Sequence, residues 1–195
     1  HDVEAAQRRA ERLEADPGFR RALKAERRAV AADESFVAEK LPLLAAVGGP
    51  QAMTAGRLRR ELGLDRLREL AAGSGPDAVA AKRMLARVSS LASFYLPRDL
   101  LVAGRWREAE TVLEVAVVAD PEAPPHVWYN LACAASRSGH LDRALEALER
   151  AVDHGFADSA HVLADPDLEA LRTSHEHAAR LQALVQRLRP GAPEA

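Results

Sequence analysis

The sequence contains a single cysteine, Cys133, and few aromatic residues, and each scarcity limits what the chain can be. One cysteine excludes an internal disulfide and any metal centre built from several thiolates, and it leaves the redox compartment open. Aromatic residues make up only 4% of the 195 residues, whereas 48% are hydrophobic. The core therefore has to be built from closely packed alanine, leucine and valine, a composition that favours helices.

The chain also lacks an excess of one charge and a long apolar run. Its 29 acidic and 27 basic residues give a formal net charge of −2, so no overall field recruits nucleic acid or anionic lipid. No apolar run approaches the roughly 18 residues of a membrane helix, and no charged-then-apolar leader opens the chain. We therefore expect neither a nucleic-acid nor a membrane partner.

The basic residues are 24 arginines and 3 lysines, and alanine is abundant, which favours a GC-rich bacterial source. The chain starts at His1 rather than at a methionine, which favours a processed form or a fragment of a larger protein.

Apolar residues recur at spacings of three and four almost throughout, which predicts an all-α protein. The first helix is predicted over residues 3–13, and Asp16-Pro17 predicts the start of a second. Pro42 is expected to end or kink that second helix. Its apolar residues include a row spaced by seven, but the complementary heptad row is charged. We therefore expect the row to pack on this chain's own body, with a homodimer through the N-terminal helices as the alternative; the row is Leu23, Val30, Val37 and Leu44.

Gly48-Gly49-Pro50 is the clearest break in the pattern. It predicts an N-terminal helical arm over residues 1–48, a helical body over residues 49–189 and a frayed tail over residues 190–195. Residues 51–72 predict two short helices that meet near Gly63.

The strongest internal signal is a repeat with a period of 35 residues, anchored on Gly104 and Gly139. Each glycine is followed by apolar residues at offsets of five, nine and twelve. In the second copy Trp128, Leu131 and Ala132 precede the glycine. The residues at the shared offsets are Ala109, Leu113 and Ala116 in the first copy and Ala144, Leu148 and Ala151 in the second.

The second copy, WYNLACAASRSGHLDRALEALERAV, closely resembles a tetratricopeptide repeat. The resemblance covers about residues 90–188 and implies antiparallel helix hairpins stacked into a right-handed solenoid. Pro97 should kink the first helix of the first copy, and a degenerate third repeat is expected from Leu64 to Ala80. The remainder resembles a segment that closes such arrays, in which Asp165-Pro166 starts a helix and Thr173 with Glu176 caps the last one.

By the same resemblance, the concave wall of the stack is lined by the first helix of each repeat and binds a protein or peptide. Asn130 matches the asparagine that bonds a ligand backbone in many such domains, whereas the lysines of the carboxylate-gripping version are missing. The competing hypothesis is that this face merely packs against the N-terminal arm. The inner positions expected to be exposed are His126, Tyr129, Cys133, Ser136 and Arg137 of the second copy, joined by Phe94, Arg98 and Leu101 of the first.

Sequence motifs for catalysis, cofactor binding or a metal centre are missing. His175 and His177 are two residues apart, and we expect both on the surface, since a helix chelates best at spacings of three or four. Cys133 sits mid-helix and is expected to be a buried, inert thiol. In residues 54–72 a helix-turn-helix is disfavoured, because Arg59 stands where that motif packs a small residue.

We therefore predict a non-catalytic binding module without metal or cofactor. The alternative is the C-terminal helical part of a larger bacterial hydrolase or redox enzyme whose catalytic domain is absent.

Overall fold

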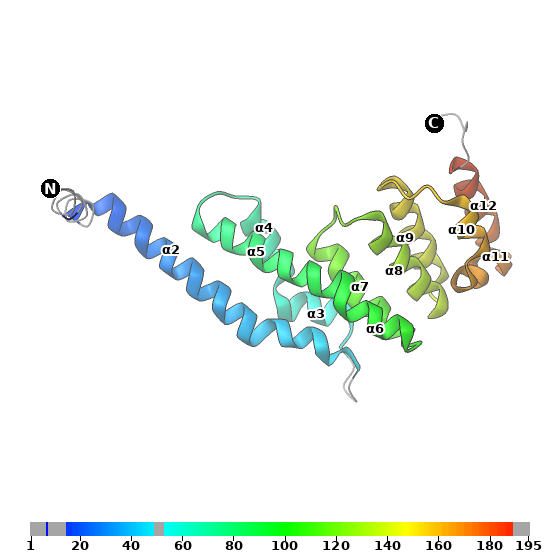
Figure 1. Cartoon of the computed structure of the whole chain (residues 1–195), viewed down its shortest axis with the longest axis horizontal. Coiled ribbons are helices and arrows are strands. Elements are labelled where there is room, and N and C mark those ends of the chain that lie inside the picture. Colours follow the sequence, from blue (N-terminus) through cyan, green and yellow to red (C-terminus); the bar gives the residue numbers. More distant parts are fainter. Residues whose placement is uncertain (1–6, 8–14, 49–52, 189–195) are drawn as a thin grey trace.

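The computed structural model describes residue 7, residues 15–48 and residues 53–188, and within these ranges it contains helices and turns without a strand. Figure 1 shows α2 extending from the body towards the N-terminus, with the helices of the body following one another towards the C-terminal end. The α-helices are α2 (Pro17–Ser35), α3 (Ala55–Leu62), α4 (Leu64–Ala71), α5 (Pro76–Ser90), α6 (Leu96–Val102), α7 (Trp106–Ala119), α8 (Pro125–Arg137), α9 (Leu141–Asp153), α10 (Ser159–Ala164), α11 (Glu169–Thr173) and α12 (Ala178–Arg187). The π-helical turns are η1 (Phe36–Lys40) and η3 (Leu91–Tyr95), and the 3-10 segments are η2 (Leu41–Gly48) and η4 (Pro166–Leu168).

Helices adjacent in the sequence pack against each other, most extensively α8 with α9, and α7 packs against both α6 and α8. The predicted all-α fold of helix hairpins is confirmed. The first helix predicted from the sequence and the predicted tail lie outside the described residues.

The two repeat glycines end their helices in the same way. Gly104 and Gly139 have φ values of 68° and 85°, in the left-handed region that favours glycine. The residue after each glycine donates its backbone N–H back into the helix, from Arg105 to the Leu100 carbonyl and from His140 to the Ala135 carbonyl. This closure satisfies carbonyls at the helix end and reverses the chain into the next helix.

Each π-helical turn immediately precedes a proline-containing segment. Pro97 cannot donate a backbone hydrogen bond, and its ring crowds the carbonyl four residues earlier, which lies in η3. Pro42 stands in the same relation to η1. The wider turns accommodate both prolines, so the helical path continues where a break or kink was expected. The α-helical part of the arm ends at Ser35, seven residues before Pro42.

The expected third repeat, from Leu64 to Ala80, falls on the α4–α5 pair. Helices α4 and α5 do pack against each other, but α5 runs through η3 directly into α6. One long helical segment is therefore both the partner of α4 and the first helix of the next hairpin, leaving no separate second helix for an upstream repeat.

The expectation that the arm's heptad row packs on the body is also wrong for three of its four residues. Leu23, Val30 and Val37 are exposed, and only Leu44 is buried. The arm instead contacts α5 through a different face, which carries the buried residues Ala29, Asp33 and Phe36. Charge decides this choice, because Asp33 pairs with both Arg83 and Arg87 of α5.

The predicted capping box of the last helix is wrong as well. Thr173 donates its hydroxyl to the Glu169 carbonyl within α11. The hydroxyl of Ser174 accepts the backbone N–H of His177 at 3.4 Å and contacts its ring at 2.8 Å. His177 is buried against Asp142 rather than lying on the surface, whereas His175 is exposed as expected.

The apolar residues at the shared repeat offsets, together with Leu131, are buried in a common hydrophobic cluster. This core is dominated by small side chains that let α8 and α9 approach closely. Its repeat residues are Ala109, Leu113, Ala116, Leu131, Ala144, Leu148 and Ala151.

Replacing Leu148 with alanine should lower the free energy of unfolding by about 2–5 kcal/mol, because it leaves a cavity between helices that cannot fully collapse. Urea unfolding measures the loss. Glu146→Ala on the exposed face of the same helix is the matched control and should change the value by less than about 0.5 kcal/mol. Equal effects of the two changes would contradict the core assignment.

Candidate functional site

The inner face of α8 is covered where the sequence predicts an open wall. Tyr129 and Cys133 are each 5% exposed, and Ser136 is buried too. Their expected exposure on the inner wall is therefore wrong, whereas the expected burial of the Cys133 thiol is confirmed. The covering segment is the C-terminal part of the chain, since both η4 and α11 pack against α8.

Aromatic stacking holds the first part of this cover in place. The Tyr129 ring lies parallel to Phe156, with 4.4 Å between the ring centroids, and a tilted His161 ring lies 5.3 Å away. Arg172 anchors the next part, because its guanidinium donates to the backbone carbonyls of Val162 and Asp165. The closing segment therefore takes the place beside α8 that a following repeat would occupy.

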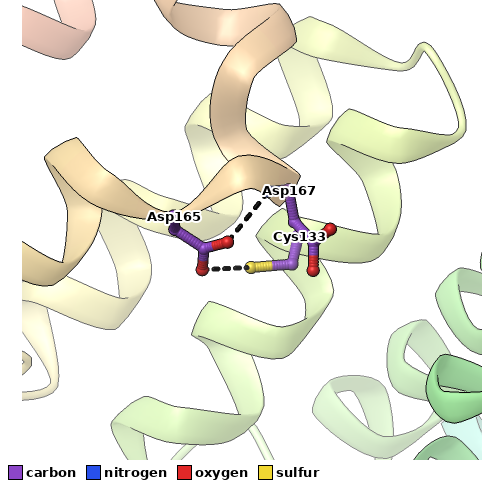
Figure 2. Close-up of side chains that lie close together, drawn as sticks. All are labelled: Cys133, Asp165 and Asp167. Atoms are coloured by element: carbon purple, nitrogen blue, oxygen red, sulfur yellow. Dashed lines mark hydrogen bonds between the residues drawn. The ribbon is translucent and has the colours of Figure 1, made fainter.

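Asp165 is the polar centre of this contact (Figure 2). Its Oδ2 accepts the Tyr129 hydroxyl at 2.7 Å and the Cys133 thiol at 3.6 Å. Its Oδ1 accepts the backbone N–H of Asp167 at 2.9 Å, which starts the 3-10 turn at Pro166. One carboxylate thus joins the inner face of α8 to the beginning of η4.

Burial and negative charge suppress ionisation around this carboxylate. Burial and the hydrogen bond to Asp165 raise the pKa of the Tyr129 hydroxyl far above its usual value. Burial raises the pKa of the Cys133 thiol, and the carboxylates of Asp165 and Asp167 add to that effect. The thiol is therefore protonated at neutral pH and is a poor nucleophile.

Cys133, Asp165 and Asp167 each place a possible metal-ligand atom within 4.8 Å of the others. Both oxygens of Asp165 already accept hydrogen bonds, and the thiol favours its protonated form. A metal ion at this position would have to break the hydrogen bonds that Tyr129 and Cys133 donate to Asp165. We therefore interpret the cluster as a packing network.

Other predicted site residues remain accessible. His126 and Arg98 are exposed, and Asn130 is half-buried. Arg137 lies with its guanidinium carbon 4.9 Å from the centre of the Trp106 ring and 3.9 Å from an Asp167 oxygen. That placement orients the Arg137 guanidinium at the edge of the closed part of α8.

Large exposed apolar side chains gather on η3 and α6. Phe94, Tyr95 and Val102 are 57%, 61% and 87% exposed, and the first two rings make an edge-to-face pair. Phe94, Arg98 and Leu101 are spaced by four and three, so they share one helical face. We call these five residues, Phe94, Tyr95, Arg98, Leu101 and Val102, the α6 face.

A groove lies between α3, α7, α8 and α9. This groove has a volume of about 570 Å³ and a partly apolar floor that includes Val115, Val118 and Leu131. Arg143 pairs with Glu114 in its wall. Local sequence patterns do not predict the groove, because α3 and α9 are far apart in the chain.

Sequence reasoning also missed Tyr95, Val102 and the role of Asp165. Tyr95 and Val102 stand seven residues apart around Arg98, a spacing that indicates a shared side of the helix. Asp165 was recognised as the start of a helix, but nothing local indicates that it accepts a bond from Tyr129, 36 residues earlier.

Comparison with known protein families matches residues 125–154 to the tetratricopeptide repeat. These residues are similar to a tetratricopeptide repeat. The match covers the α8–α9 hairpin, which is the second copy of the repeat found in the sequence. Together with the helical architecture, it makes the protein tetratricopeptide-repeat-like.

A chloroplastic protein of Arabidopsis thaliana is 39% identical to this chain over 56 residues. The matched part is 29% of this chain and 17% of that protein, so the chain spans only a small part of the relative's length. No solved structure matches the chain. Among the described helices, none is both long and apolar enough to cross a membrane.

Replacing Tyr129 with phenylalanine should lower the free energy of unfolding by about 1–3 kcal/mol, because a buried carboxylate loses a hydrogen-bond donor. Tyr95→Phe is the matched control, since that hydroxyl is on an exposed side chain. Chemical denaturation of both variants measures the difference. If the two changes cost the same, the Asp165 network does not stabilise the closing segment.

Asp167→Asn should raise the melting temperature at neutral pH. Burial and neighbouring Asp165 raise the pKa of the Asp167 carboxyl, despite the opposing effect of Arg137, so folding disfavours its ionised form. Asparagine mimics the neutral form, and the advantage should vanish as the pH falls through the pKa of Asp167. Glu169→Gln, on an exposed neighbour, is the control. Melting curves between pH 3 and pH 8 test the sign.

Proposed function

We propose that the protein is a binding module that captures a protein or peptide through the α6 face. The observation that carries the proposal is the exposure of two aromatic rings and a valine around an arginine on the first helix of a repeat. Aromatic and arginine side chains are the residues that most often dominate protein interfaces. Tetratricopeptide repeats suggest protein–protein interaction, and the family is generally non-catalytic.

The proposal moves the centre of the predicted site from α8 to α6. Tyr129 and Cys133 are engaged with Asp165 and cannot reach a ligand without displacing the closing segment. The neighbouring helix α8 supplies polar residues that would contact the same ligand, namely His126, Asn130 and Arg137. Arg137 would contribute a guanidinium already oriented by Trp106.

The α6 face suits an extended or helical peptide with apolar anchors. Edge-to-face packing fixes Phe94 and Tyr95 relative to each other, so little side-chain freedom is lost on binding. Arg98 offers a charged donor between the aromatic pair and Val102. These features favour a ligand with apolar residues near a carboxylate.

The alternative that the chain is a helical part of a larger enzyme stays a prediction, as does the lack of catalysis. The sequence of the complete gene would test the first.

Selection of peptides from a displayed random library against the full chain tests the α6 face. Binding of the selected peptides should fall at least about tenfold in the Phe94→Ala, Arg98→Ala double variant, because an apolar anchor and a charged donor are lost. Fluorescence anisotropy measures affinity, and melting curves should show an unchanged fold.

The control is Leu163→Ala, which truncates an exposed leucine on α10. Peptides that bind the double variant and the control equally well would contradict the α6 face as the binding site. Tyr129→Phe should leave peptide binding unchanged, since that side chain is buried.

A further inference from the structure

The arm carries an apolar row that the described part of the chain leaves exposed. Phe19, Leu23, Val30 and Val37 are between 37% and 41% exposed. At 100° per residue Phe19, Leu23 and Val30 fall within an arc of about 40° on one side of α2, and Val37 follows in η1. Such a continuous row differs from scattered exposed apolar residues, which need no explanation.

The row is separate from the face that holds the arm to the body. Asp33 is fixed by Arg83 and Arg87, and Arg28 pairs with Asp77 at the start of α5. The buried face is centred about a quarter-turn from the exposed row. The arm is therefore held with its apolar row free to contact a second helix.

Charge is distributed unevenly along the arm. Residues 17–30 carry five basic side chains and one acidic side chain, whereas residues 31–40 carry three acidic side chains and one basic side chain. Arg27 and Glu34 flank Val30 on the same side of the row, and both are exposed. A helix with this distribution is complementary to itself only when the second copy runs in the opposite direction.

We propose that two copies of the chain associate through antiparallel arms, each formed by α2 and η1, with the symmetry axis near Val30. Val30 packs on Val30 of the other copy, and Leu23 packs on Val37. Arg27 of each copy then lies beside Glu34 of the other, and the basic half of one arm covers the acidic half of the other. A parallel pair in register would place the Arg27 and Glu34 side chains of the two copies on opposite flanks of the contact, where they cannot pair.

This inference is independent of the proposed function, because the α6 face and the exposed row of α2 share no residue. A variant that loses peptide binding but still self-associates, or one that self-associates no longer but still binds peptide, distinguishes the proposed function from the proposed dimer.

Sedimentation equilibrium of the full chain measures self-association. We expect a monomer–dimer equilibrium, and Val30→Glu should weaken it at least about tenfold, because two carboxylates would meet at the axis. The control is Leu163→Glu, at an equally exposed position on α10. A chain that stays monomeric up to about 100 µM would overturn the proposal. Binding of the monomer to anionic vesicles or to another protein would also count against a dimer, because the row would then have a different partner.

Charge exchange tests the direction of the pair. Arg27→Glu and Glu34→Arg should each weaken the dimer, and the double variant should restore it to within about threefold. In a parallel pair the double exchange would restore nothing. Failure of restoration would therefore overturn the antiparallel arrangement.

Disulfide cross-linking tests the register. Leu23→Cys and Val37→Cys proteins should form a mixed disulfide when combined, and neither should cross-link to itself, because equivalent residues would lie about 21 Å apart. The native Cys133 is buried and does not compete. Self-linking of the Leu23→Cys protein would contradict the register.

Discussion

Close packing of small side chains between α8 and α9 is the constraint on which the rest of the structure depends. Alanines fill most of their contact, and the leucines that complete it are fully buried. Because few aromatic rings are available to fill a wide gap between helices, the helices have to lie close together. The glycine turn at Gly139 permits this approach because it reverses the chain within the three residues between α8 and α9. A larger residue at Ala144 or Ala151 would push apart the hairpin that supports both neighbours.

The end of the helix stack determines which surface is left for a ligand. A stacked hairpin exposes an unsatisfied face at its last repeat, and the closing segment covers it here through Asp165. The same carboxylate starts η4 and accepts the Tyr129 hydroxyl. Formation of η4 and docking of the closing segment on α8 are therefore coupled. That coupling explains why the inner face of α8 is structural while the α6 face, one repeat earlier, stays accessible.

Local pattern predicted the repeat, and long-range contacts decided the site. The spacing of Gly104 and Gly139 with their alanines determines helix ends and the hairpin core, so both could be derived from the sequence. The burial of Tyr129 depends on Asp165 and Phe156, which belong to a segment without a repeat pattern. The repeat resemblance alone places Tyr129 on an open wall, because it describes a repeat in the interior of an array.

Charge pairing explains the other failed expectation and what it implies for the arm. Periodicity ranks the Leu23–Val30–Val37 row as the packing face, yet a buried Asp33 between two arginines sets the rotation of α2 on α5. An unpaired carboxylate at that position would cost more than the burial of a few methyl groups provides. Pairing Asp33 with the body therefore turns the apolar row outward, which leaves it exposed for the self-association proposed above.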